Sequence, residues 1–188
     1  NGTVSDIPYR PLGPGIGYYD AARGDRVDDF KIPYHSLSAS VLLPGEVRLT
    51  SEYAKIKVST ASKGMTRWGA YLAVSRKFGD WTPYVYYAKT KSSGSSLDSY
   101  QTINRNTSPM FPPSLNAYQK LNADILSPYD QATTALGASY RYGTHSLIKA
   151  ELSQTRTGIV SSFIDAPPGG ESNNQEINIF SLSYNFTF

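Results

Sequence analysis

Residues 176–188, at the end of the chain, restrict the fold more than any other segment, because large apolar and small polar side chains alternate along them. Alternate residues of an extended strand point to opposite faces, so the pattern predicts a strand with one apolar face. About ten residues of a tilted strand are enough to cross a bilayer. One face would carry Phe180, Leu182, Tyr184, Phe186 and Phe188, and the other Ile179, Ser181, Ser183, Asn185 and Thr187.

The same alternation recurs along the chain and predicts about seven strands. In 66–78, for example, Trp68 and Leu72 would face outward while Arg67 and Tyr71 face inward. Aliphatic residues and Tyr on one face, with small and charged residues on the other, suit a lipid-facing wall around a wet lumen. We therefore expect an all-β fold, a transmembrane antiparallel β-barrel. The other expected strands are 30–43, 47–59, 82–91, 131–142 and 146–157.

The expected connections alternate between short and long. Residues 44–46, 79–81 and 143–145 form short turns, whereas 59–65, 92–129 and 158–175 are longer and rich in Gly, Pro, Ser and Asn. Outer-membrane barrels have short periplasmic turns and long extracellular loops. We therefore expect a periplasmic C-terminus and a membrane-spanning region over 30–188.

The same alternation makes a prediction about the N-terminal end. Counting strands backward places residues 1–29 on the long-loop side, as an extracellular loop segment. Bacterial single-chain barrels have an even number of strands. At least one further strand is therefore expected before residue 1, and the 188 residues are expected to form an incomplete barrel.

Composition restricts the remaining function classes. The hydrophobic fraction is 39% and the mean hydropathy is −0.38, values that alternating membrane strands also produce. No Cys is present, which excludes disulfides and thiolate metal sites. The net charge of +3 is scattered, so no nucleic-acid partner is expected. His35 and His145 lack metal-ligand or catalytic spacing, so we expect no enzyme, no cofactor and no metal site.

Three segments carry a family resemblance. Alternate aromatic and apolar residues ending in Phe188 resemble the C-terminal signal that the barrel-assembly machinery recognises in outer-membrane barrels. Residues 130–142 followed by 147–152 look like the penultimate hairpin of proteobacterial porin-like proteins, and 78–85 is similar to an internal hairpin of that group. The signal residues would be Phe180, Leu182, Tyr184, Phe186 and Phe188.

The resemblance implies the C-terminal part of a barrel of about 16 strands in a bacterial outer membrane. It implies passive diffusion of small hydrophilic solutes or ions, with outer-membrane lipids and lipopolysaccharide as surroundings. Porin-like proteins are about twice as long as these 188 residues. A homotrimer, or an N-terminal half on a separate segment, therefore stays open as an alternative.

Charged residues on the expected inward faces are the candidates for pore lining. Fixed charges in a lumen bias ion selectivity, but they could equally pair across it and stiffen the wall. The long loop 92–129 could fold into the lumen, cover its mouth or remain a surface loop. The charged candidates are Arg48, Glu52, Arg67, Lys77, Arg141, Lys149 and Glu151.

Two functions remain in view. The first is a porin-like channel, favoured because the inward faces are rich in Ser, Thr, Ala and Gly, which leave a lumen open. The second is a plugged or small structural barrel whose extracellular loops bind a partner. A soluble all-β binding protein and a barrel enzyme are the more remote alternatives.

Overall fold

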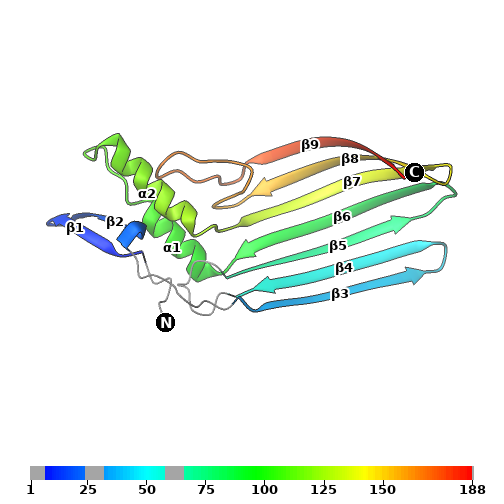
Figure 1. Ribbon diagram of the computed structural model, residues 1–188, viewed down its shortest axis with the longest axis horizontal. Coiled ribbons are helices and arrows are strands. Elements are labelled where there is room, and N and C mark those ends of the chain that lie inside the picture. Colours follow the sequence, from blue (N-terminus) through cyan, green and yellow to red (C-terminus); the bar gives the residue numbers. More distant parts are fainter. Residues whose placement is uncertain (1–6, 24–31, 58–65, 188) are drawn as a thin grey trace.

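The computed structural model describes residues 7–23, 32–57 and 66–187. Its main feature is a sheet of seven antiparallel strands that follow one another in chain order (Figure 1). The strands are 10 to 13 residues long, and the expected positions are confirmed to within a few residues. They are β3 (Tyr34–Leu43), β4 (Val47–Ile56), β5 (Arg67–Arg76), β6 (Trp81–Ser92), β7 (Asp130–Tyr142), β8 (Ser146–Thr157) and β9 (Glu176–Phe186).

The sheet is open within the described residues, with β3 and β9 as its two edges. Tight turns join β3 to β4, β5 to β6 and β7 to β8 at one end, as expected. Gly45, Gly79 and Gly143 have φ of 78°, 59° and 64° in these turns, a region where a side chain is strained. We call this the short-turn end. The expected long connection 59–65 lies outside the described residues.

Strand pairing assigns every side chain to one of two faces. Register is continuous from Leu49 through Val74 and Val85 to Leu136 and Leu152, so these aliphatic residues share one face. The neighbouring positions, such as Thr50, form the opposite face. We call these the apolar face and the polar face of the sheet. Both match the facing predicted from sequence.

A second unit lies beyond the other end of the strands (Figure 1). It contains the hairpin β1 (Tyr9–Gly13) and β2 (Ile16–Tyr19), a 3-10 turn (Ala21–Arg23), and helices α1 (Gly94–Asn104) and α2 (Pro113–Ile125). Together with residues 158–175 we call this unit the cap. Residues 92–129 and 1–29 were expected to be loops, so the two helices and the hairpin are corrections to that expectation.

Local signals explain where the helices begin. The Ser93 side chain accepts a hydrogen bond from Ser96 N at the start of α1, which satisfies a free backbone donor there. Pro113 occupies the first turn of α2, where its missing N–H costs nothing. Neither described helix is long and apolar enough to cross a membrane.

The buried apolar core lies in the cap. Tyr100 and Ile103 of α1 pack against Ala123 and Leu126, and residues of the hairpin and of 158–175 cover them. Buried amides then join the pieces: Gln119 binds both backbone groups of Tyr19 at 2.9 and 3.0 Å. Asn104 donates to Gly170 O at 2.7 Å. The cap therefore has a closed interior of its own.

Candidate functional site: the two faces of the sheet

The apolar face is exposed along its whole length. Leu136 at the centre of β7 is 65% exposed, and Leu182 of β9 is 69% exposed. Among exposed large apolar side chains on the described strands of this sheet, only Tyr34 and Leu42 lie on the polar face. A continuous apolar surface of this size marks contact with a membrane or another protein. Its exposed members are Leu37, Val41, Leu43, Leu49, Tyr53, Leu72, Val74, Trp81, Val85, Tyr87, Leu136, Tyr142, Ile148, Leu152, Phe180, Leu182, Tyr184 and Phe186.

Aromatic pairs border the aliphatic band at both ends. Trp81 and Tyr140 pack with ring centroids 4.7 Å apart at the short-turn end. Tyr53 and Trp68 stack at 6.3 Å toward the cap. At the register level of that second pair the apolar face becomes charged: Lys89 lies there, as do ion pairs between Lys91 and Asp130 at 3.6 Å and between Arg156 and Glu176 at 2.8 Å.

The predicted signal residues occupy the apolar face of the edge strand β9. Phe180, Leu182, Tyr184 and Phe186 are each more than half exposed. Tyr184 and Phe186 stack with ring centroids 6.5 Å apart, and the Tyr184 hydroxyl lies 3.0 Å from Ser146 Oγ. Phe188 lies outside the described residues.

The centre of the polar face holds a hydrogen-bonded cluster. Tyr84, Gly137 and Glu151 lie side by side on three successive strands. The Tyr84 ring lies over Gly137, where an added Cβ would come within 2.2 Å of its hydroxyl oxygen. Its hydroxyl donates to Glu151 Oε2 at 2.6 Å, and Tyr86 donates to Oε1 at 3.1 Å. Gly137 is therefore the position that lets a tyrosine reach across a strand.

Lys149 completes this cluster. Its Nζ is 3.0 Å from Glu151 Oε2 and 5.0 Å from the centre of the Tyr84 ring. The Glu151 charge is thus matched by an ammonium group and two hydroxyl donors. Lys149 and Glu151 thus pair with each other along one strand, β8, which is not the pairing across a lumen that the sequence left open.

The other candidate charges on the polar face are separate from this cluster. Arg48 donates to Ser40 Oγ at 3.2 Å and shares a hollow of about 280 Å³ with Lys77, which directly follows β5. The Arg67 guanidinium lies 4.8 Å from the centre of the Tyr129 ring near the cap. Glu52 lines a second hollow beside Tyr71. Arg141 is exposed at the short-turn end of β7.

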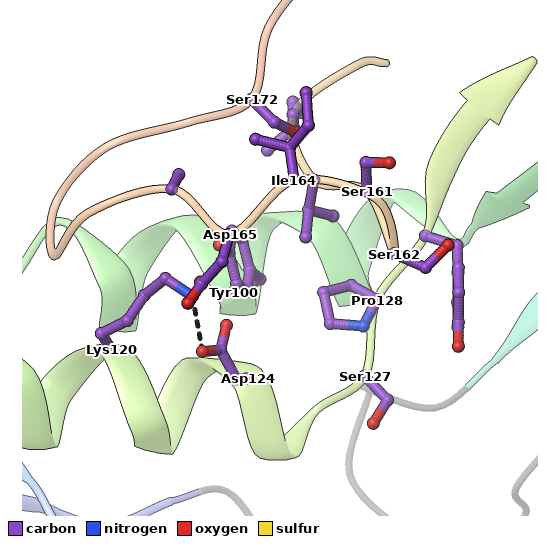
Figure 2. A pocket seen from close by; sticks show the side chains of 14 residues that line it. Tyr100, Lys120, Asp124, Ser127, Pro128, Ser161, Ser162, Ile164, Asp165 and Ser172 are labelled. Carbon is purple, nitrogen blue, oxygen red and sulfur yellow. Dashed lines mark hydrogen bonds and ion pairs between the residues drawn. The ribbon is translucent and has the colours of Figure 1, made fainter. Parts of the chain in front are cut away.

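Sequence reasoning missed a polar hollow in the cap, of about 240 Å³ (Figure 2). Lys120 of α2 points into it and binds Asp124 at 2.5 Å and Asp165 at 2.8 Å, which ties α2 to residues 158–175. Burial lowers the pKa of Lys120, but hydrogen bonds to the two carboxylates outweigh this and raise it above the ordinary value. The i, i+4 spacing of Lys120 and Asp124 was a visible helix signal.

Within the described residues, no group of three or more His, Cys, Asp or Glu side chains is arranged to hold a metal ion. Comparisons of the chain with protein-family models, with curated proteins and with solved structures found no match. The geometry of the two faces is therefore the basis for inferring function.

Proposed function

We propose that this chain forms part of the wall of an outer-membrane porin-like channel for passive diffusion of small hydrophilic solutes or ions. One observation carries the proposal: a seven-stranded sheet exposes an apolar face and lines its other face with small and charged side chains. A soluble sheet buries its apolar face against a second layer. A barrel wall in lipid instead turns its apolar face outward, because the surrounding solvent is hydrocarbon.

The dimensions of the apolar band support lipid as its surroundings. On β5, Trp68 and Arg76 bracket the band eight residues apart, roughly 27 Å along the strand. A strand tilt of about 40° reduces this to about 21 Å, a little less than the roughly 25 Å apolar band of outer-membrane barrels. Aromatic residues border the band, as they do at membrane interfaces. Soluble strands average about 5 or 6 residues, roughly half the length of these.

Edge strands impose a further requirement in this proposal. Backbone groups in hydrocarbon must all be hydrogen-bonded, so β3 and β9 need neighbours. Seven antiparallel strands leave these two edges running in the same direction, so antiparallel closure takes an odd number of additional strands. An N-terminal segment carried separately or outside these residues could supply them in a barrel of about 16 strands, and a homotrimer is compatible with this.

The position of the cap favours a channel over the alternative, a plugged barrel that acts through its loops. The helices pack on each other and on β2, beyond the strand ends, and not along the polar face (Figure 1). In the proposed orientation the cap is extracellular and borders the mouth. Lipopolysaccharide would surround it, and the β9 residues would serve the barrel-assembly machinery.

The membrane part of the proposal is tested by depth-dependent fluorescence quenching. Leu136→Trp and Ser181→Trp, each in a background with Trp68 and Trp81 replaced by Phe, lie at nearly the same level on opposite faces. Lipids brominated near the bilayer centre should quench the first strongly and the second weakly. Equal quenching, or full solubility without detergent, would contradict a lipid-facing wall.

The channel part is tested by conductance. Native protein extracted in detergent and placed in a planar bilayer should give stable ohmic steps. Correctly inserted protein that shows the quenching difference but conducts nothing would exclude the channel and leave the plugged or interacting barrel.

A further inference from the structure

The charges on the polar face are unbalanced. Five cations lie on it or at its short-turn edge, against three carboxylates: Glu52 and Glu151 on the strands and Glu46 in the β3–β4 turn. Glu151 is already matched by Lys149 and two tyrosines, so it offers little attraction to a passing cation. The cations are Arg48, Arg67, Lys77, Arg141 and Lys149.

Arg48 and Lys77 form the closest grouping of these cations. Arg48 lies directly opposite Ser75 in the β4–β5 register, and Lys77 is two residues further on the same face. Such diagonal neighbours are roughly 7 to 8 Å apart. Neither forms an ion pair within the part of the chain that the structure describes. Two like charges this close gain from an anion placed between them.

The surroundings of the pair suit oxygen-bearing anions. Ser75 and Thr82 line the same hollow and contribute hydroxyl donors, and Ser40 Oγ lies 3.2 Å from the Arg48 guanidinium. Glu46, in the β3–β4 turn, is the carboxylate on the rim of this hollow. Its backbone carbonyl accepts a hydrogen bond from Lys77 N at 3.2 Å, so one carboxylate faces two cations in this hollow. Arginine offers a planar fork of donors that matches carboxylate or phosphate oxygens.

We propose that Arg48 and Lys77, with Ser75 and Thr82, form an anion-binding subsite at the short-turn end of the channel, so that the pore passes small anions in preference to cations. This inference depends on the proposed function, because it needs the polar face to line the conducting path.

The test is the reversal potential of the native channel in a potassium chloride gradient, compared between the wild-type protein and the double variant Arg48→Gln, Lys77→Gln. Wild type should reverse toward the chloride potential. Each removed cation should lower the chloride-to-potassium permeability ratio by roughly fivefold, the Boltzmann factor for unit charges about 4 Å apart in water. Inorganic phosphate at neutral pH should reduce chloride current in wild type and not in the double variant.

Arg76→Gln is the matched control. Arg76 is adjacent to Lys77 but lies on the apolar face, where it donates to Gly45 O at 3.1 Å and covers the Phe78 ring at 4.5 Å. Its removal changes the charge equally and should leave the reversal potential unchanged. Ohmic steps that prefer potassium, or an equal shift in Arg76→Gln, would overturn the anion subsite while leaving the channel intact. A silent wild-type bilayer would instead overturn the proposed function.

Discussion

Leu126, at the end of α2, and Leu136, at the centre of β7, are ten residues apart in sequence and lie in opposite environments. Leu126 is 4% exposed within the apolar core of the cap, and Leu136 is 65% exposed on the apolar face of the sheet. The cap thus hides apolar side chains behind its own elements, as a water-soluble fold does. The sheet leaves them outward, which is stable only in apolar surroundings.

Polar side chains also differ between the cap and the sheet. In the cap, Gln119 and Asn122 are almost fully buried and bind backbone groups of Tyr19. On the sheet, Ser, Thr and charged residues instead line the polar face. One chain therefore contains a region that buries its apolar side chains and a region that exposes them, joined at the ends of the strands (Figure 1).

The largest effect should come from removing the centre of the cap core. Tyr100→Ala deletes a ring that is 1% exposed, and truncating a buried aromatic costs about 3–5 kcal/mol. Hydrogen exchange should show faster opening of α1 and α2, with the strands still protected. Met110→Ala, at a side chain 85% exposed, should change the cap by less than about 0.5 kcal/mol. Simultaneous loss of strand protection would show that the two regions are not separate.

A slightly smaller loss of stability is expected when an arginine is placed on the apolar face and not on the polar face of the sheet. Leu72→Arg places a cation on the apolar face, at a cost of about 2–4 kcal/mol near the bilayer midplane. Ala73→Arg, the next residue, places it on the polar face, where water can solvate it. Denaturant unfolding in lipid vesicles should show the difference. If Leu72→Arg were the better tolerated of the two, the assignment of lipid and water to the two faces would be reversed.

The faces of the sheet could be predicted because their signal is local. A period of two assigns Leu72 and Ala73 to opposite sides whatever the partner strands are. The Tyr84–Gly137–Glu151 cluster could not be predicted in this way, because it depends on the register of three strands and residues 67 positions apart. Likewise, the sequence around Gln119 does not show that its side chain binds Tyr19, because that contact depends on how the hairpin packs against α2.

The helices of the cap were missed for a different reason. Ser93 before α1 and Pro113 at the start of α2 are recognised helix-start residues. The segment between β6 and β7 is nevertheless rich in Ser, Asn and Pro, a composition that favours a loop. The apolar residues of the two helix segments have only a weak helical periodicity, so no pattern indicated a helix against that composition.

The smallest effect should come from the contacts that hold residues 158–175 to the helices. The Glu171 carboxylate accepts from Gln101 Nε2 at 2.8 Å and from Arg105 Nη2 at 2.6 Å, and it also binds Asn173. The hydrogen bond from Gln101, with those from Arg105 and Asn173, lowers the pKa of Glu171 despite partial burial. This carboxylate therefore stabilises the cap above its unfolded pKa of about 4.3. The stabilisation is lost as the pH falls through its lower folded pKa.

Glu171→Gln should consequently weaken the cap by about 1 kcal/mol at neutral pH and remove the part of its acid sensitivity that appears below about pH 4. Hydrogen exchange across 158–175 as a function of pH measures both. Asp98→Asn, at an exposed position of α1, removes the same charge and should leave the acid profile unchanged. If both variants shifted the profile equally, net charge and not the Glu171 contacts would control the cap. The aliphatic band of the apolar face should show no pH dependence in this range, since the band itself carries no carboxylate.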